Sequence, residues 1–227
     1  MATHDTHRNT PPRLAIIGGG PAGLTLALLM RARAPHWSVT LFDARPEDRD
    51  ISGDPRTLAL SRGSIQLLER LGAWPAAAAA PIRRVHVSQA PPTLSTPLGE
   101  SAVDLHADEL GVPLLGAVLG YGALVAPLQA RVFAARDETG ATAAGARLQV
   151  RFGTPVEAVT TAVDRESVRV KPAGAEDETF EFAVIAEGGV FSDQARKSIS
   201  HDYRQVAWVG RVTLEGAAPG LAIERFT

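Results

Sequence analysis

Three consecutive glycines, Gly18 to Gly20, stand between two apolar runs near the start of the chain. The run before them, residues 14–17, is short and continuous, as in a strand buried on both faces of a parallel sheet. The run after them, residues 24–30, consists mostly of good helix formers, and Pro21 suits the first turn of a helix. The sequence therefore predicts a strand, a tight turn and a helix, with side chains excluded from the turn.

Gly18, Gly20 and Gly23 form the GxGxxG pattern of dinucleotide-binding turns. In such a turn the first glycine allows the tight bend, the second lets a pyrophosphate approach the backbone, and the third lets the helix pack on the strand. Pro21 and Ala22 fall in the first helical turn, where the helix dipole and free amides meet the pyrophosphate. The alternative is a turn with a structural role only.

Residues 38–44, SVTLFDA, predict a second strand that ends on an acid. Strand, helix and strand together make one βαβ unit. Asp43 stands 20 residues after Gly23, where an acid accepts hydrogen bonds from a ribose 2′-hydroxyl and disfavours a 2′-phosphate. The unit therefore predicts a site for FAD or NAD rather than NADP, with Arg45 as a second candidate on the adenosine side.

Composition and motifs exclude several other classes of function. The formal net charge of −2 argues against a nucleic-acid partner. The chain has no cysteine, which rules out disulfides, thiolate metal ligands and a cysteine nucleophile. The serines lack a GxSxG context, and no spacing of histidines and acids indicates a metal site. His86 and His106 lie in predicted strand or loop regions without the partnered acid and serine of a catalytic triad, so we interpret them as structural or solvated.

Along the rest of the chain an α/β beginning gives way to short β-rich runs, among them a strand at residues 82–89 and β structure at residues 204–216. Residues 45–50 mix charges of both signs and are interpreted as a solvated loop, and the alanines at 76–80 as a linking segment. A helix is predicted within residues 61–75, where Ile65, Leu68 and Leu71 have helical spacing and Gly72 falls at the cap, and another at residues 123–136.

We predict an α/β fold with a Rossmann-like domain and an inserted, mostly antiparallel β domain. The predicted ranges are a disordered lead at 1–12, the Rossmann-like domain at 13–80 and 108–200, and the β domain at 81–107 and 203–227.

Several segments, in this order, resemble one known family of enzymes. They are IIGGGPAGLTLALLM, the acid at Asp43, DPRTLALSRGSIQLLERLGAW, PIRRVHVSQ and TFEFAVIAEGG. The family is the FAD-dependent aromatic hydroxylases of the para-hydroxybenzoate hydroxylase class. The middle series is most similar to the 2-polyprenyl-6-methoxyphenol hydroxylases of ubiquinone biosynthesis. The resemblance extends over residues 13–227 and implies that the Rossmann-like domain binds FAD.

The resemblance also implies roles for particular residues. Arg56 matches an arginine that lies along the FAD near its pyrophosphate, and Val156 matches a strand whose backbone meets the adenine. Glu187 and Gly188 match an Ala-Asp-Gly motif that touches both FAD and the pyridine nucleotide, with glutamate in place of aspartate. Arg196 is a match to the arginine that follows the motif.

Two departures from the family pattern affect what the chain can do. Small apolar residues stand where the family often has a polar residue opening a helix, so Tyr121 is a candidate for that flavin contact. The second FAD motif, of the type Gly-Asp-Ala-Ala-His, does not occur before Thr227. The chain therefore resembles the N-terminal part of a hydroxylase, truncated at its C-terminal end.

The resemblance implies a monooxygenase that uses FAD, NAD(P)H and oxygen to hydroxylate a phenol carrying a polyprenyl chain. It implies no metal and assigns no catalytic residue. The expected partners are the phenolic substrate and a quinone-making complex, with a cytoplasmic location peripheral to the inner membrane. The alternatives are an inert or partner-dependent FAD-binding fragment, or another flavoprotein oxidoreductase of the same fold. An NAD-linked dehydrogenase is disfavoured because β-rich runs replace a continuing βαβ series.

Overall fold

The chain folds into two compact units in the computed structural model. The structure describes residues 10–90, 101–136, 147–161, 166–187, 204–206, 208, 210, 212–216 and 218–226. The first unit comprises Met1–Thr57, Gln66–Ala78 and Gly120–Gln194. The second comprises Leu58–Ile65, Ala79–Leu119 and Ala195–Thr227. The fold is mixed α/β with a Rossmann-like domain, as the sequence predicts, and its sheets include parallel and antiparallel pairings.

A parallel sheet forms the centre of the first unit. Its strands are β1 (Arg13–Ile17), β2 (Ser38–Asp43), β8 (Leu148–Phe152) and β12 (Phe182–Ile185), in the order β12-β1-β2-β8. All three pairings in this sheet are parallel. β1 is buried almost throughout, which confirms the interpretation of residues 14–17 as a strand covered on both faces. β2 is also buried from Val39 to Asp43.

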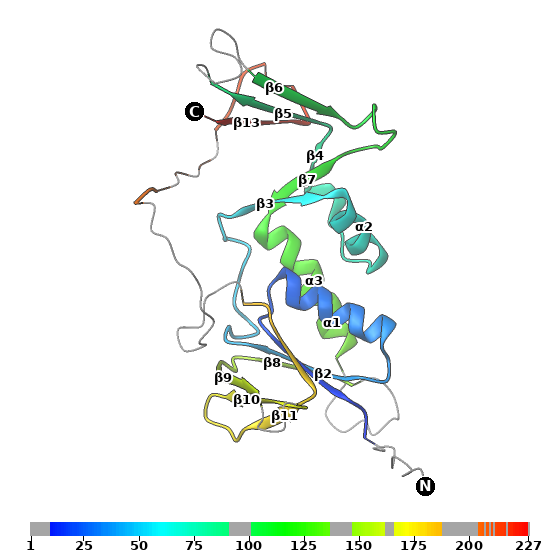
Figure 1. Ribbon diagram of the computed structural model, residues 1–227, viewed down its shortest axis with the longest axis vertical. Helices are drawn as coiled ribbons and strands as arrows, with labels where there is room; N and C mark the ends of the chain where they lie inside the picture. Colours follow the sequence, from blue (N-terminus) through cyan, green and yellow to red (C-terminus); the bar gives the residue numbers. More distant parts are fainter. Residues whose placement is uncertain are drawn as a thin grey trace. The chain divides into compact units, whose positions relative to one another are not determined.

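Two helices lie side by side against one face of this sheet (Figure 1). α1 (Pro21–Arg33) packs on β1 and β2, and α3 (Tyr121–Ala135) packs on β8. α1 starts at Pro21, where a missing N–H leaves no helical bond unmade, and ends one residue before Ala34. Both helices were predicted within two residues of these bounds at either end.

An antiparallel sheet covers the opposite face of the parallel sheet. Its strands are β9 (Val156–Thr161), β10 (Val168–Pro172) and β11 (Glu178–Phe180). Side chains from the two sheets form one buried cluster: Ala15, Ile17, Phe42, Val156, Val170 and Phe180. Because β1 turns alternate residues toward the helices and toward this cluster, both faces of the sheet are covered at its central strands β1 and β2.

A short helix links the two units. α2 (Arg62–Arg70) buries Ile65 and Leu68, and the chain then bends at Gly72, whose φ of +64° suits glycine. A 3₁₀ turn, η1 (Ala76–Ala78), occupies the predicted alanine-rich link.

The second unit contains two small sheets. One holds β3 (Thr57–Ser61), β7 (Gly116–Gly120) and β4 (Ala80–Ile82) in the order β3-β7-β4. The other holds β5 (Arg84–Gln89), β6 (Ser101–His106) and β13 (Leu221–Phe226) in the order β13-β5-β6. β5 pairs antiparallel with β6 and parallel with β13. Residues 58–65 and 108–119, predicted within the Rossmann-like domain, fall in this unit because β3 pairs with β7.

Two strand predictions need correction. Residues 82–89 were predicted as one strand, but the chain breaks at Arg83, whose N–H donates to the Gly220 carbonyl. β4 and β5 therefore belong to different sheets. Residues 204–216 were predicted as β structure, but those of them that the structure describes lie outside any strand. Residues 1–9 of the predicted lead lie outside the described residues.

No helix in the described part of the chain is long and apolar enough to cross a membrane.

Candidate functional site

Two glycines of the turn after β1 are required by packing within the protein. Gly18 has a φ of +110°, and a Cβ there would lie 2.7 Å from the backbone of Ala186 and Glu187. A Cβ on Gly23 would lie 1.9 Å from the Gly18 carbonyl oxygen. Gly18 thus lets β1 approach the end of β12, and Gly23 lets α1 pack on the turn.

Gly20 is different, because no contact with the described residues requires a glycine there. Its φ of −78° is open to any residue. A Cβ at this position would meet the Tyr121 hydroxyl at 3.7 Å and the Ala186 carbonyl oxygen at 3.9 Å, both ordinary contact distances. The absence of a side chain at Gly20 instead leaves room for a ligand to approach the backbone.

The N-terminus of α1 lies directly beside Gly20. Gly20 is the N-cap residue and provides no side-chain cap, and the Leu24 N–H donates to its carbonyl. The first-turn amides of Ala22 and Gly23 have no partner within the helix. Together with the positive end of the helix dipole, these amides suit a phosphate group.

Asp43, at the end of β2, is held by the turn and by Arg45. Asp43 is 6% exposed. Its Oδ2 accepts from the Gly19 N–H at 2.5 Å and from Arg45 Nη2 at 3.0 Å. Its Oδ1 accepts from the Arg45 backbone N–H at 2.7 Å and from Arg45 Nε at 3.0 Å. The hydrogen bond to Asp43 raises the pKa of the Arg45 guanidinium, although burial opposes this.

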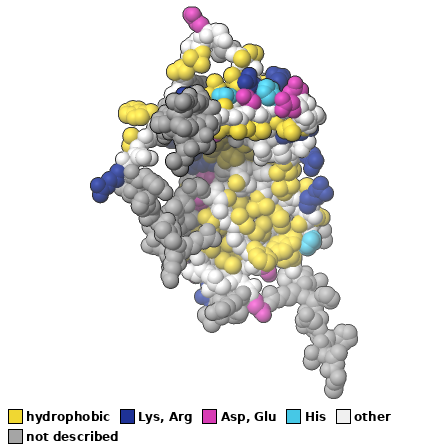
Figure 2. All heavy atoms as spheres, turned by 45° about the horizontal axis from the view of Figure 1, so that its top comes forward, with side chains coloured by type: hydrophobic (Ala, Val, Ile, Leu, Met, Phe, Trp, Pro, Cys, Tyr) yellow, Lys and Arg dark blue, Asp and Glu magenta, His cyan; other side chains and the backbone are white. Residues whose placement is uncertain are grey.

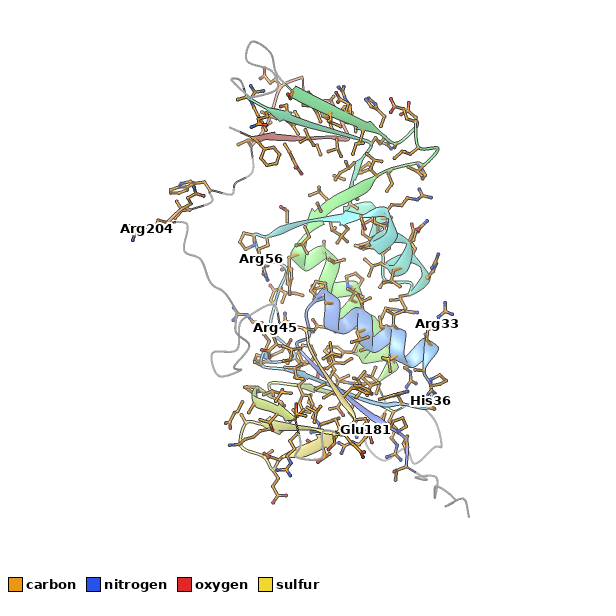
Figure 3. All side chains as sticks on the ribbon, viewed as in Figure 1. Arg33, His36, Arg45, Arg56, Glu181 and Arg204 are labelled. Atoms are coloured by element: carbon orange, nitrogen blue, oxygen red, sulfur yellow. The ribbon has the colours of Figure 1, made fainter. Side chains whose placement is uncertain are left out.

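A pocket of about 630 Å³ opens next to these residues, and all of its lining comes from the first unit. Its lining residues are Arg45, Arg49, Asp50, Ile51, Gly53, Asp54, Pro55, Arg56, Tyr121 and Glu187. Figure 3 shows Arg45 and Arg56 on the same side of the unit, and Arg33 on the other. The lining carries three arginines and three carboxylates, so it is strongly polar with no formal excess of either charge.

Arg56 lies on the pocket wall, held by two neighbours. Its Nη2 lies 2.6 Å from Asp54 Oδ2, and its guanidinium carbon lies 3.9 Å from the centre of the Tyr121 ring. Arg56 lowers the pKa of Asp54 to about 2 through this hydrogen-bonded pair. The Arg56 side chain is 61% exposed, so the guanidinium has a face available to a ligand phosphate.

Glu187 follows the end of β12 and lines the same pocket. Burial, and secondly the charge of Asp43, raise the pKa of the Glu187 carboxyl. Its side chain forms no hydrogen bond or ion pair with any other residue that the structure describes.

The structure brings most of the predicted site residues together. Gly18, Gly20, Pro21, Ala22, Gly23, Asp43 and Glu187 lie at the neighbouring ends of β1, β2 and β12 and at the start of α1, and Arg56 lines the adjoining pocket. The prediction for Val156 concerns its backbone; its side chain packs in the core and does not line the pocket. Gly188 and Arg196 lie outside the described residues.

Sequence reasoning missed Arg49 and the part that Arg45 plays. Arg49 lines the pocket from the loop after β2, which had been interpreted as solvated. The Arg45 guanidinium donates to both oxygens of the Asp43 carboxylate, from Nε to Oδ1 and from Nη2 to Oδ2. An acid at the end of a strand with arginine two residues later was the available signal, but the direction of the arginine side chain depends on the folded turn.

His86 was interpreted as structural or solvated, and the structure adds an acidic neighbour that the sequence pattern did not indicate. The antiparallel register of β5 and β6 places His86 opposite Asp104, with Nδ1 3.2 Å from the carboxylate. Arg84 Nη2 lies 2.7 Å from the same carboxylate. Arg84 first, and then His86, lower the pKa of Asp104. Figure 2 shows histidine, acidic and basic side chains gathered where this sheet lies. No group of residues suited to a metal ion occurs in the described part of the chain.

Comparison with known proteins agrees with a Rossmann-like fold for this chain. The family described as NAD(P)-binding Rossmann-like domain matches residues 16–61. The chain is similar to the Diels-Alderase PyrE3 of the pyrroindomycin biosynthetic pathway, with 17% identity, a TM-score of 0.52, and coverage of 78% of this chain and 32% of that one. It is similar to FqzB, with 13% identity, a TM-score of 0.51, and coverage of 79% and 36%.

A third structure, 2,6-dihydroxypyridine-3-hydroxylase from Arthrobacter nicotinovorans, matches at 15% identity and a TM-score of 0.47, with coverage of 77% and 36%. At these identities PyrE3 and FqzB share the fold with this chain. The chain spans 32–36% of the length of the three structures.

Proposed function

We propose that this chain is the FAD-binding part of a flavin-dependent monooxygenase. The observation that carries the proposal is Gly20, at the N-terminus of α1 and beside a polar pocket, where packing against the described part of the chain does not require a glycine. A dinucleotide pyrophosphate accounts for it, because its oxygens must come close to the backbone there. The match to NAD(P)-binding Rossmann-like domains at residues 16–61 supports a dinucleotide as the ligand.

The order of sequence motifs supports FAD over NAD as the resident nucleotide. The glycine turn, Arg56 and Glu187 follow one another as in the flavin-dependent aromatic hydroxylases. In the structure Arg56 and Glu187 line one pocket, next to the turn. A single ligand that reaches from the turn along this pocket would contact all three.

Each of these groups has a chemical task toward FAD. The first-turn amides of α1 would hold the pyrophosphate, and the exposed face of Arg56 would neutralise its charge. Bound FAD, reduced by NAD(P)H, would supply the oxygen-activating chemistry. The residues of this chain bind and orient the cofactor and limit the access of water to it.

At the finer level we propose a phenol with a polyprenyl chain as the substrate, in ubiquinone biosynthesis. This proposal rests on the resemblance of the series RTLALS, LLERLGAW and VHVS to the hydroxylases of ubiquinone biosynthesis. The same resemblance supports a quinone-making complex as the partner and a peripheral membrane location. The fold itself does not fix the reaction, since the similar PyrE3 is described as a Diels-Alderase. An FAD-binding fragment that needs a partner for activity is the second candidate.

The proposal is tested by adding FAD, NAD⁺ or NADP⁺ to the purified chain and removing free ligand by gel filtration. We expect a flavin absorbance spectrum to remain with the protein, and little retention of either pyridine nucleotide. Retention of NAD⁺ without FAD would overturn the flavin assignment. Retention of none would overturn the dinucleotide site.

A further inference from the structure

The second unit carries most of the large apolar side chains that are exposed among the described residues. The first unit contributes Phe182 and Val184. The second contributes Val103, Leu105, Leu110, Val206, Trp208, Val212, Leu214, Ile223 and Phe226. Soluble proteins rarely expose large contiguous apolar patches outside binding sites. Those of these side chains that lie side by side therefore form a candidate binding surface.

The β13-β5-β6 sheet, shown in Figure 1, carries four apolar side chains on one face. The register of β5 and β6 pairs Val85 with Leu105 and Val87 with Val103. Directly paired residues and residues two positions apart share a face, so all four side chains point the same way. Val103 is 59% and Leu105 48% exposed, and Val85 and Val87 are half-buried. We call Val85, Val87, Val103 and Leu105 the apolar patch.

The other face of the same sheet carries the charged and titratable side chains of β5 and β6. Arg84 pairs with His106, and His86 with Asp104, at the positions that alternate with the apolar patch. Ile223 of β13 pairs with His86 and therefore lies on this second face too. The sheet thus has one apolar and one charged face, and the apolar patch is suited to a ligand without charge.

The edge strand β13 limits what can cover the apolar patch. Glu224 pairs with Val87, is exposed, and is the one charged side chain that these three strands place on the apolar face. A second copy of the chain packed flat on this face would bury Glu224 without a cation from the three strands, which is costly. An anionic lipid surface is bound by Lys and Arg rather than by an acid. A neutral, flexible hydrocarbon chain that lies along β5 and β6 would cover the patch and leave Glu224 in water.

We propose that the apolar patch binds the polyprenyl chain of the phenolic substrate. This inference rests on the proposed function, which supplies a ligand with a long hydrocarbon chain. At ~3.3 Å per residue, the stretch of β6 from Leu105 to Ser101 is about 13 Å long, so the patch can hold part of an extended chain. Its residues bind the chain through burial of apolar surface and take no part in the reaction of the phenol ring.

The experiment measures by calorimetry the affinity of the 227-residue chain for phenol, 2-prenylphenol and 2-geranylphenol. The head group is constant in this series, so the gain in affinity with each isoprene unit reports contact with the hydrocarbon chain. The variants are Val103→Glu, Leu105→Glu and the nearly isosteric Val103→Thr. Ile223→Glu and Ala102→Glu are controls that add the same charge on the opposite face of the sheet. The Tm of every variant is recorded to show that it is folded.

We expect the wild type to gain about tenfold in affinity with each isoprene unit, because one side of each unit leaves water. Val103→Glu and Leu105→Glu should remove nearly all of this gain, and Val103→Thr should reduce it to about threefold. The affinity for phenol itself should stay unchanged in every variant. Both control variants should keep the gain of the wild type.

Three results would overturn the inference. The first is a wild type whose affinity does not depend on the length of the hydrocarbon chain. The second is a control variant that loses the gain as fully as Val103→Glu does, since the opposite face would then matter equally. The third is another occupant: a dimer in sedimentation velocity, or binding to phosphatidylglycerol vesicles, that Val103→Glu abolishes.

The proposed function is tested separately by retention of FAD. Retained FAD with no gain along the phenol series would overturn this inference alone. A gain along the series without retained FAD would overturn the proposed function and keep the apolar patch as a site for an isoprenoid chain.

Discussion

The two units differ in how fully they bury their apolar side chains. In the first, strands β1 and β2 are covered on both faces, and Ile16, Ile17 and Phe42 are fully buried, while Phe182 on the edge strand β12 is 61% exposed. In the second, the β13-β5-β6 sheet leaves Val103 59% exposed and Phe226 57% exposed. Burial of large apolar side chains is the dominant source of stability, so the first unit has much the larger reserve.

This difference bears on where a ligand site can be built. The glycine turn lies at the end of a strand whose neighbours on both faces are fixed, so its backbone geometry is determined by the core around it. The charged cluster of Arg84, His86 and Asp104 lies instead on an exposed sheet. Exposed ion pairs of this kind contribute little to stability. Substitutions in the two units should therefore differ greatly in cost.

The largest effect is expected for Gly23→Ala. The new Cβ would fall 1.9 Å from the Gly18 carbonyl oxygen, so α1 would have to move away from β1. We expect a loss of about 3 kcal/mol or more in the free energy of unfolding, measured by urea denaturation. Gly53→Ala is the control, since no atom lies within 4 Å of a Cβ there. Equal stability of the two variants would contradict the packing described for the turn.

A paired truncation compares the two units directly. Phe42→Ala removes a ring that is 0% exposed and should cost about 3–5 kcal/mol in the free energy of unfolding. Phe226→Ala removes a ring of the same size from the exposed sheet and should cost about 0.5 kcal/mol or less. Both values come from chemical denaturation followed by circular dichroism. A cost above ~2 kcal/mol for Phe226→Ala would show that this face is covered in solution.

Local patterns in the sequence were sufficient to predict the βαβ unit and the turn. Residues 14–17, Pro21 and the spacing of Gly18, Gly20 and Gly23 each constrain their own neighbourhood, and the structure agrees with them. Asp43 was placed correctly at the end of its strand for the same reason.

Features that depend on distant parts of the chain were not predictable in this way. The pairing of His86 with Asp104 requires the register of β5 and β6, which no local pattern specifies. The pairing of Arg45 with Asp43 requires the Arg45 side chain to turn back over the Gly19 carbonyl. The break at Arg83 depends on the Gly220 carbonyl, far along the chain.

A smaller expected effect is the pH dependence of stability, which has opposite signs for Glu187 in the first unit and Asp104 in the second. Burial raises the pKa of the Glu187 carboxyl above its ordinary value of 4.5, so the stability that its protonated form contributes is lost as pH rises through and above that value. The pKa of Asp104 is lowered below 3.8, so its contribution is present above that value and is lost as pH falls. Glu187→Gln should therefore raise the Tm relative to wild type more at pH 7 than at pH 4. Asp104→Asn should lower the Tm at pH 7, with the difference shrinking toward pH 3. Thermal unfolding of both variants and the wild type over this pH range checks these expectations. A Tm difference of the same sign for Glu187→Gln and Asp104→Asn at pH 7 would contradict the causes assigned to the two pKa shifts.

The visible absorbance of the chain mixed with FAD tests most directly whether a dinucleotide binds at the turn around Gly20. The comparison is between wild type and Gly20→Asp, with Gly63→Asp in α2 as a charge-matched control away from the pocket, and with the Tm of every sample recorded. We predict that Gly20→Asp keeps a Tm close to that of the wild type, because a Cβ there meets no atom closer than 3.7 Å, yet loses the bound flavin spectrum. A Gly20→Asp variant that folds and still retains FAD as the wild type does would contradict a dinucleotide site at this turn.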